Sequence, residues 1–256
     1  MIKLNLQSWQ LNIREILLYR IGKNLLWWLE NIVTRYSLIG NDAFFDSKQF
    51  PWVTKLENNW QTIRKELDLV LQYTDNLPNF HDISPDQARS LTQDNLWKTY
   101  FLYGFGTKAE QNCQYCPQTA DLLAQIPGMK TAFFSILLPG KHIPEHRGPY
   151  KGFIRYHLGL KVPEPREKCR IRVGEETRHW EEGKSLIFDD SFPHEAWNKT
   201  DGIRVVLFVD IVRPLAFPGS LINQLVINLI AWSPFVKDAK KNQIKWDQYL
   251  EKIFNS

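Results

Sequence analysis

The pattern of hydrophobic and polar positions divides the chain into two helical ends and a strand-rich middle. Residues 13–36 carry apolar side chains at helical spacing with charges between them, and a second helical pattern runs from about Trp52 to the turn at Pro78. Turn residues and polar caps replace this periodicity over residues 80–96. Helical spacing returns over residues 221–255. The sequence therefore predicts helices at both ends of the chain.

The middle of the chain consists of short runs rich in Ile, Val, Phe and Leu, separated by Pro and Gly. The runs read TAFFSILL, GFIRYHLGLKV, CRIRV, SLIFDD and IRVVLFVDIV. No helical pattern is interleaved with them, which favours an all-β sandwich or jelly roll over a parallel α/β sheet. We predict an α+β protein with a mainly β core over residues 96–215, a helical region over 1–95 that packs on this core, and a helical extension over 216–256.

Composition narrows the class of protein. A hydrophobic content of 43% in 256 residues suffices for one full core, so one domain with helical additions is expected. The net charge of +4 comes without long Lys/Arg blocks, which argues against nucleic-acid binding. Three cysteines are too few for a secreted disulfide scaffold. We read Cys113 and Cys116, which form a CxxC motif, as two loop thiols in preference to a redox pair or half of a zinc site.

Polar residues inside the predicted strands are the first candidates for a site. In GFIRYHLGL, side-chain alternation places Arg155 and His157 on one face and apolar residues on the other. In IRVVLFVDI, Arg204 lies among Val and Phe, and a buried guanidinium needs an anionic or hydrogen-bonding partner. We expect no acid of the same run to supply it. A small dicarboxylate ligand would, and the hydroxyl of Ser135 in FFSIL could join that site.

Three histidines raise the question of a metal. His142 and His146 are four residues apart, but Pro144 opposes a helix that would bring them together as in HExxH zinc sites. They could instead share one face of an extended strand. His194 follows an Asp-rich turn. Non-haem iron oxygenases use two histidines and one carboxylate, which in an HxD/E motif stands two residues after the first histidine. Here that position is Gly148.

At these residues the sequence resembles the aspartyl/asparaginyl β-hydroxylase family of Fe(II)- and 2-oxoglutarate-dependent dioxygenases. The matching segments, in family order and spacing from Ser135 to Pro214, are SILLPGKHIPEHRGP, RYHLGL, WEEGKSLIFDDSFPHEAWN and RVVLFVDIVRP. The resemblance implies a double-stranded β-helix, in agreement with the strand pattern. It also implies a hydroxylase that converts 2-oxoglutarate to succinate at an Fe(II) held without a carboxylate ligand, because this family has a glycine at the position of Gly148.

The resemblance implies roles for particular side chains. His146 and His194 would be the catalytic Fe(II) ligands. Ser135 and Arg204 would hold the distal carboxylate of 2-oxoglutarate. Arg155 and His157 would lie near its metal-chelating end.

The substrate is left open by one departure from the family pattern. Members that act on peptide aspartate resemble one another in a second arginine two residues before the position of Arg155, and here that residue is Phe153. The substrate classes are therefore a peptidyl aspartate or asparagine, an amino acid, or a lipid, since the family includes bacterial enzymes similar to lipid A acyl-chain hydroxylases. Two other hypotheses are a zinc hydrolase that uses His142, His146 and His194, and a non-enzymatic binding module.

The location follows from what the sequence lacks. We find no signal-peptide pattern and no run of 18 apolar residues, so we expect a cytoplasmic protein. The apolar segments LLWWLENIV and LINQLVINLIAW could lie at a membrane interface, although packing over the outer face of the barrel is the stronger expectation. Peripheral membrane contact and the oligomeric state are left open.

Overall fold

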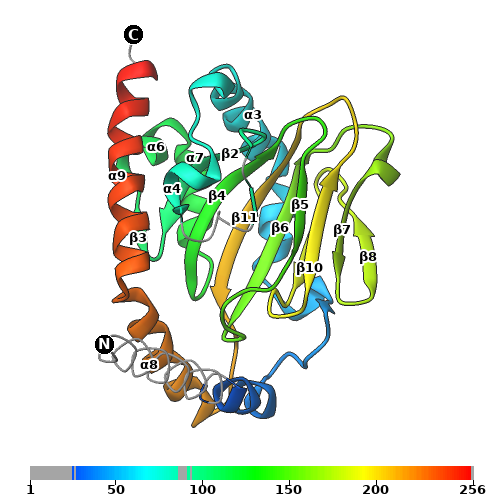
Figure 1. Ribbon diagram of the computed structural model, residues 1–256, viewed down its shortest axis with the longest axis vertical. Helices are drawn as coiled ribbons and strands as arrows, with labels where there is room; N and C mark the ends of the chain where they lie inside the picture. Colours follow the sequence, from blue (N-terminus) through cyan, green and yellow to red (C-terminus); the bar gives the residue numbers. More distant parts are fainter. Residues whose placement is uncertain (1–24, 26, 86–90, 93, 255–256) are drawn as a thin grey trace, which may run out of the picture.

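Two antiparallel sheets form the centre of the molecule in the computed structural model, which describes residues 25, 27–85, 91, 92 and 94–254 (Figure 1). The larger sheet has the strand order β1-β9-β6-β11-β4-β2-β3, and the smaller has the order β5-β10-β7-β8. The strands of the larger sheet are β1 (Phe44–Phe45), β2 (Trp97–Gly104), β3 (Thr107–Lys108), β4 (Met129–Leu137), β6 (Phe153–Lys161), β9 (Ser185–Phe188) and β11 (Arg204–Val212). Those of the smaller are β5 (His142–His146), β7 (Cys169–Val173), β8 (Glu176–His179) and β10 (His194–Asn198).

The two sheets pack face to face around a shared apolar layer. This layer joins Phe133 and Phe208 of the larger sheet to Ile171 and Ala196 of the smaller. On the other face of the larger sheet, β11 contributes Val205, Leu207, Val209 and Ile211 to a core covered by helices. This alternation confirms the predicted jelly-roll sandwich, and it turns the side chains of Arg204, Phe208 and Asp210 toward the space between the sheets.

The five predicted strands are present as β4, β6, β7, β9 and β11. The strands β2, β3, β8 and β10 were not predicted, and for β5 an extended strand at His142 and His146 was only left open. In β5 and β10, polar residues hide the alternation that marks a half-buried strand. One strand, β1, lies in the region that we expected to be helical, where it forms the edge of the larger sheet and pairs with β9. The boundaries of the three predicted regions stay a prediction.

The helices cover the outer face of the larger sheet and one end of the sandwich (Figure 1). Residues 27–36 are helical, and most of the predicted helix before them, residues 13–24 and 26, lies outside the described residues. The other helices are α2 (Val53–Asn58), α3 (Trp60–Leu71), α4 (Phe80–Ile83), α6 (Glu110–Tyr115), α7 (Pro117–Ala124), α8 (Gly219–Ala231) and α9 (Pro234–Phe254), with 3₁₀ turns η1 (Ser47–Gln49), η2 (Thr74–Asn76) and η3 (Arg166–Lys168).

Two predicted helices are each divided. The helix expected from Trp52 to Pro78 breaks at Asn59, whose φ of −107° and ψ of 10° leave the helical range while its side-chain amide donates to the carbonyl oxygen of Lys55. The C-terminal helix breaks before Pro234, because proline disfavours a helical conformation in the residue that precedes it. The break separates α8 from α9 and turns them by 62°.

We predicted that the CxxC cysteines are loop thiols, but they belong to a helical segment packed in the core. Cys113 lies within α6, Cys116 joins α6 to α7, and both are free and buried in the core beneath the larger sheet. Burial raises the pKa of Cys113 to about 12 and that of Cys116 well above its usual value. Both thiols are therefore protonated at neutral pH and serve as small apolar side chains.

Candidate active site

His146 and His194 face each other where β5 pairs with β10. The two residues are directly opposite in the strand register, and their ring centroids are 4.1 Å apart. Each ring donates from Nδ1 to a backbone oxygen two residues earlier, Pro144 O at 2.8 Å and Phe192 O at 2.9 Å. The Nε2 atoms are left for another partner. Backbone carbonyls that orient imidazoles in this way are typical of metal-binding histidines.

The electrostatics of the pair suit metal binding. Burial lowers the pKa of both imidazoles, and for His194 burial together with the neighbouring His146 lowers it to about 3. Both rings are therefore neutral at neutral pH, which is the form that binds a metal. The Nε2 atom of His194 is buried and has no hydrogen-bond partner in the described part of the chain.

Gly148 lies against the carboxylate of Asp190, which explains why this position carries no side chain. A Cβ atom at Gly148 would lie 2.2 Å from Oδ2 of Asp190, and the Gly148 amide donates to the Asp190 carbonyl oxygen at 2.7 Å. The turn that carries Asp190 is held from behind by the buried ion pair of Asp189 with Arg213, at 2.6 Å. A carboxylate two residues after His146 would therefore have no room.

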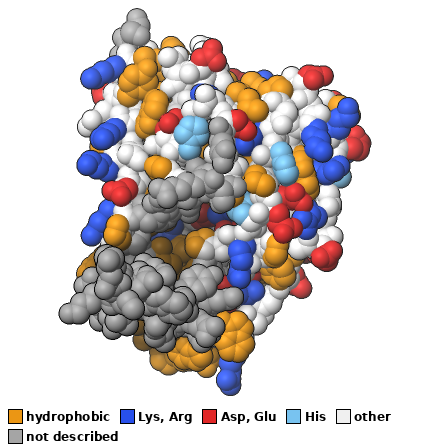
Figure 2. All heavy atoms as spheres, in the orientation of Figure 1, with side chains coloured by type: hydrophobic (Ala, Val, Ile, Leu, Met, Phe, Trp, Pro, Cys, Tyr) orange, Lys and Arg blue, Asp and Glu red, His pale blue; other side chains and the backbone are white. Residues whose placement is uncertain are grey.

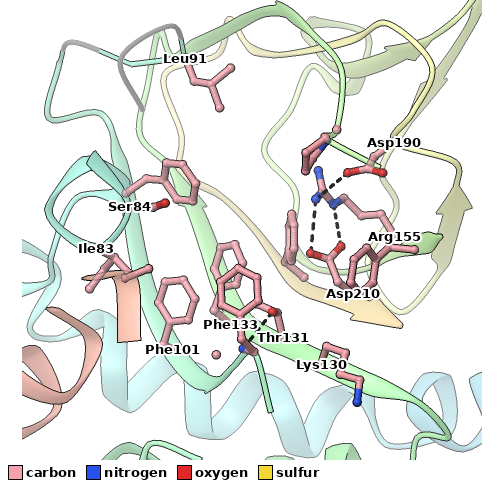
Figure 3. A pocket seen from close by; sticks show the side chains of 18 of the residues that line it. Ile83, Ser84, Leu91, Phe101, Lys130, Thr131, Phe133, Arg155, Asp190 and Asp210 are labelled. Atoms are coloured by element: carbon pink, nitrogen blue, oxygen red, sulfur yellow. Dashed lines mark hydrogen bonds and ion pairs between the residues drawn. The ribbon is translucent and has the colours of Figure 1, made fainter. Parts of the chain in front are cut away.

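Arg155 lies beside the histidines and is bound by two aspartates (Figure 3). Its Nη2 is 2.9 Å from Asp190 Oδ2, and its Nε is 2.9 Å from Asp210 Oδ1. Burial opposes the charge of Arg155, but the two carboxylates outweigh it and raise its pKa. Burial raises the pKa of Asp190 to about 7 against the attraction of Arg155. The predicted contact of Arg155 with the co-substrate stays a prediction, because its described polar contacts are with these carboxylates.

His142 and Glu145 do not join this group. His142 is exposed, contacts Glu195 at 3.1 Å through Nε2 and stacks on Trp197. Glu145 turns away to Arg172. Across the described residues, no three His, Cys, Asp or Glu side chains are placed to hold a metal ion together. The three-histidine set of the zinc-hydrolase hypothesis is thus wrong, whereas the two-histidine pair is present.

Arg204 is buried between the sheets, and no carboxylate of the described residues pairs with it. It is 1% exposed, its guanidinium lies 4.3 Å from the centre of the Trp180 ring, and Nη1 donates weakly to the backbone oxygen of Ser135 at 3.4 Å. Its Nε has no hydrogen-bond partner among the described residues. Burial lowers the pKa of Arg204 to about 10, so it stays charged at neutral pH. We had expected no acid on its strand face; Asp210 does lie there, but it pairs with Arg155.

The remaining predicted residues, Ser135 and His157, lie in the same buried space. The Ser135 hydroxyl accepts from Nε1 of Trp97 at 3.1 Å. Trp180 donates from Nε1 to Nδ1 of His157 at 3.3 Å, and since an indole can only donate, the proton of the neutral His157 is on Nε2. Burial lowers the pKa of His157 well below its usual value. Its Nε2–H is therefore a buried donor, unpaired within the described part of the chain.

These groups form a line through the interior of the sandwich. The Phe188 ring lies 5.9 Å from the ring of His194 and 5.0 Å from that of His157, and Trp180 joins His157 to Arg204. A pair of neutral imidazoles therefore stands at one end of the line. At the other end stands Arg204, which no carboxylate of the described residues neutralises, with the Nε2–H of His157 between. An elongated anion between the two ends could reach both a metal ion on the imidazoles and the guanidinium.

A cavity of about 470 Å³ opens beside the histidine pair. Arg155 and Asp190 lie on one side of it (Figure 3), and His146 and Gly148 also line it. The opposite wall is apolar and includes Ile83, Leu91, Phe101 and Phe133 (Figure 3). Phe80 also lines the cavity, and Phe208 lines it beside Arg155, whose guanidinium lies 4.3 Å from the centre of the Phe208 ring. A substrate in this cavity would contact hydrocarbon over most of its length.

Replacing Gly148 by alanine should destabilise the protein, because the new methyl group must displace the Asp190 carboxylate. We expect a loss of about 1–3 kcal/mol in the free energy of unfolding, measured by denaturant titration. In an Asp190→Ala background, where the space is empty, the same change should cost much less. An equal loss in both backgrounds would show that the contact between Gly148 and Asp190 is unimportant.

Sequence reasoning missed the aromatic and acidic residues that complete the site. Trp180 and Trp97 were not singled out, because the acceptor of an indole N–H cannot be identified until the fold is known. Asp190 was noticed only as part of an Asp-rich turn. The adjacent pair Asp189 and Asp190 before His194 was the available signal, since two neighbouring buried acids need two different partners.

Comparisons with known proteins agree on one family. A family model described as aspartyl/asparaginyl beta-hydroxylase matches residues 57–214. An ornithine lipid ester-linked acyl 2-hydroxylase of Rhizobium tropici is 47% identical over 229 residues, which cover 90% of this chain and 81% of that protein. The aspartyl/asparaginyl beta-hydroxylase of Mus musculus is 37% identical over 171 residues, but these cover 65% of this chain and only 22% of that relative.

Among solved structures, the chain is similar to the Cupin_2 domain of an XRE family transcriptional regulator from Enterobacter cloacae. The identity is 13% and the TM-score is 0.32, over 46% of this chain and 99% of that one.

Proposed function

Because the chain belongs to the aspartyl/asparaginyl β-hydroxylase family, we propose that it is an Fe(II)- and 2-oxoglutarate-dependent hydroxylase of an acyl chain in a membrane lipid. Membership of a family of hydroxylases favours an enzyme over the non-enzymatic binding module. The observation that carries the choice of substrate is the apolar wall of the cavity beside His146. The relative from Rhizobium tropici, which is named for acyl hydroxylation, supports the same choice.

The residues present fit the implied metal and co-substrate. His146 and His194 would hold Fe(II) through their Nε2 atoms, since imidazole is a suitable ligand for iron and both rings are already oriented. When bound, Fe(II) with 2-oxoglutarate supplies the oxidation of a C–H bond by O₂, with release of CO₂ and succinate. The chain's own contribution is to bind, orient and exclude water.

Arg204 would pair with the distal carboxylate of 2-oxoglutarate. Its charge is buried and unneutralised in the described structure, so a carboxylate would supply the missing partner. Ser135 could donate its hydroxyl proton to the same carboxylate while it continues to accept from Trp97. The Nε2–H of His157 would donate to the co-substrate nearer the metal end. Each of these contacts satisfies a group that is otherwise costly to bury.

The cations near the cavity argue against an acidic peptide as substrate. Arg155 is bound by two aspartates, and Arg147 pairs with Glu30 at 2.7 Å. Phe153 lines the cavity at the position where peptide-directed members would have an arginine. Two of the three cations that line the cavity are thus paired with carboxylates, and Lys130 is the third. The aromatic rings can bury an acyl chain along the rest of the cavity.

A side-by-side comparison of two substrates tests this proposal. Purified protein with Fe(II), 2-oxoglutarate and O₂ would receive detergent-dispersed ornithine lipid in one reaction and an aspartate-containing peptide in another, and mass spectrometry would follow the gain of one oxygen atom. We expect hydroxylated lipid and succinate only in the first reaction. Hydroxylated peptide with unchanged lipid would assign the peptide substrate instead. Absence of 2-oxoglutarate binding would refute the oxygenase proposal itself.

A further inference from the structure

Helix α8 exposes an apolar stripe along its whole length. Its outward residues are spaced by four, four and three positions, so they lie on one side of the helix: Leu221, Leu225, Leu229 and Trp232. Leu229 is 69% exposed and Trp232 is 76% exposed. The opposite side of the helix is buried through Asn223 and Ile227. Packing on the protein therefore uses one face of α8 and leaves a second apolar face in contact with water.

A second helix extends this surface. Residues 27–36 bury Leu29 and Val33 in the same small cluster as Ile227 of α8, and they expose Trp27 at 68% and Trp28 at 53%. We expected these segments to pack over the outer face of the barrel. Each buries one face, but in a separate small cluster with Tyr150 and Leu215. Hydrophobic side chains are seen at this end of the molecule (Figure 2). The exposed ones among the described residues include side chains of α8 and residues 27–36.

The exposed surface adjoins the cavity of the proposed active site. Tyr150 and Ile230 line the cavity and also belong to the cluster beneath the surface. Arg147, the residue after His146, pairs with Glu30 of the second helix at 2.7 Å. The two helices therefore form part of the wall through which a substrate would reach the histidines.

Positive charge borders the surface. Directly after Trp232, the first turns of α9 carry Lys237, Lys240 and Lys241, with one acid, Asp238, among them. Lys and Arg side chains line the edge of the molecule over α9 (Figure 2). An apolar face beside lysines complements a bilayer that contains anionic lipid. In a two-fold dimer the same patch would meet itself and bring these lysines together, which disfavours a second copy as the occupant.

The described helices suit a position on a membrane surface. No single one of them is long and apolar enough to cross a membrane, although α8 and α9 together pass that test by length and composition despite the 62° bend between them. A helix with one face packed on protein and the other apolar can bury the second face among lipid headgroups and upper acyl carbons.

We propose that the docking face, formed by α8 and residues 27–36, binds the surface of an anionic lipid bilayer and presents the cavity to it. The inference rests on the proposed function in one respect, since an acyl substrate would then enter from the bilayer. It also develops the peripheral membrane contact that the sequence left open for a protein expected to be cytoplasmic.

Vesicle sedimentation tests the docking face. The probe is a vesicle of phosphatidylglycerol and phosphatidylethanolamine, with phosphatidylcholine vesicles for comparison. The variant Leu225→Gln/Leu229→Gln removes the centre of the stripe, and Leu69→Gln on α3, 59% exposed, is the matched control. We expect the wild type and the control to sediment with the anionic vesicles, and the double variant to partition at least about tenfold more weakly.

Several outcomes would overturn the docking proposal. Wild-type protein that stays in the supernatant would do so, as would a double variant that sediments like the wild type. A third such outcome is that light scattering shows a dimer for the wild type and a monomer for the double variant, while neither protein binds lipid. Turnover of detergent-dispersed lipid should be equal in wild type and double variant. If the wild type does not turn over the detergent-dispersed lipid, the proposed function is wrong. If it turns over this lipid but does not bind the vesicles, only the docking face is wrong.

Discussion

Replacing His146 by alanine should reduce succinate formation by more than about 100-fold at saturating 2-oxoglutarate and lipid. The reason is that a site with two protein ligands has none to spare, and His194 alone cannot hold Fe(II) in a defined position. Anaerobic calorimetry with Fe(II) should show the loss of metal binding in parallel. Far-UV circular dichroism and the thermal unfolding midpoint would establish that the variant is folded.

His142 supplies a matched control for this experiment. It is a histidine of the same strand, four residues earlier, but it is exposed and contacts Glu195 and Trp197 away from the cavity. His142→Ala should therefore keep wild-type metal binding and turnover. If His146→Ala and His142→Ala behave alike, the two-histidine assignment is wrong.

Replacing Arg204 by methionine should weaken binding of 2-oxoglutarate while leaving Fe(II) binding intact. Methionine can still pack against Trp180, but it offers no charge to the distal carboxylate. A hydrogen-bonded ion pair of this kind contributes about 2–3 kcal/mol, which corresponds to an increase of about 30- to 150-fold in Kd or KM. Titration of the metal-bound protein with 2-oxoglutarate and the dependence of turnover on its concentration measure the effect.

Arg170 offers the corresponding control. Its guanidinium lies 5.0 Å from the centre of the Trp197 ring, so it makes the same kind of stacking contact, but it is only half-buried and lies on strand β7 of the smaller sheet. Arg170→Met should leave the affinity for 2-oxoglutarate unchanged. An unchanged affinity in Arg204→Met as well would remove Arg204 from the co-substrate site, and the charge would then need another partner.

The strands that could be predicted are those whose burial differs strongly between their two faces. In β6, Ile154, Tyr156 and Leu158 reach the helix-covered core while Arg155 and His157 face the space between the sheets, so the alternation is plain in the sequence. The strands β5 and β10 each carry two adjacent polar residues, Glu145 with His146 and His194 with Glu195. Their extended form comes from pairing with each other and with β7, which is long-range information.

A residue of the candidate site could be predicted where its own strand indicated that a charged or polar side chain is buried, which costs free energy. Arg204 stood out because almost all its neighbours in the strand are apolar, and the fold does bury it without a carboxylate. Asp210 did not stand out, because the pairing of β11 with β6 decides whether its carboxylate forms an ion pair with Arg204 or with Arg155. The tautomer of His157 likewise depends on Trp180, which is 23 residues away in the chain.

The sequence by itself determined that this protein has a β core with helical ends and that its polar strand residues were candidates for chemistry, because burial periodicity and the cost of a buried charge are local properties. Only the tertiary structure decided that His146 opposes His194, that Gly148 makes room for Asp190, and that Arg155 is neutralised while Arg204 is not. These are pairings between distant strands. They depend on register and close packing, which no single stretch of sequence contains.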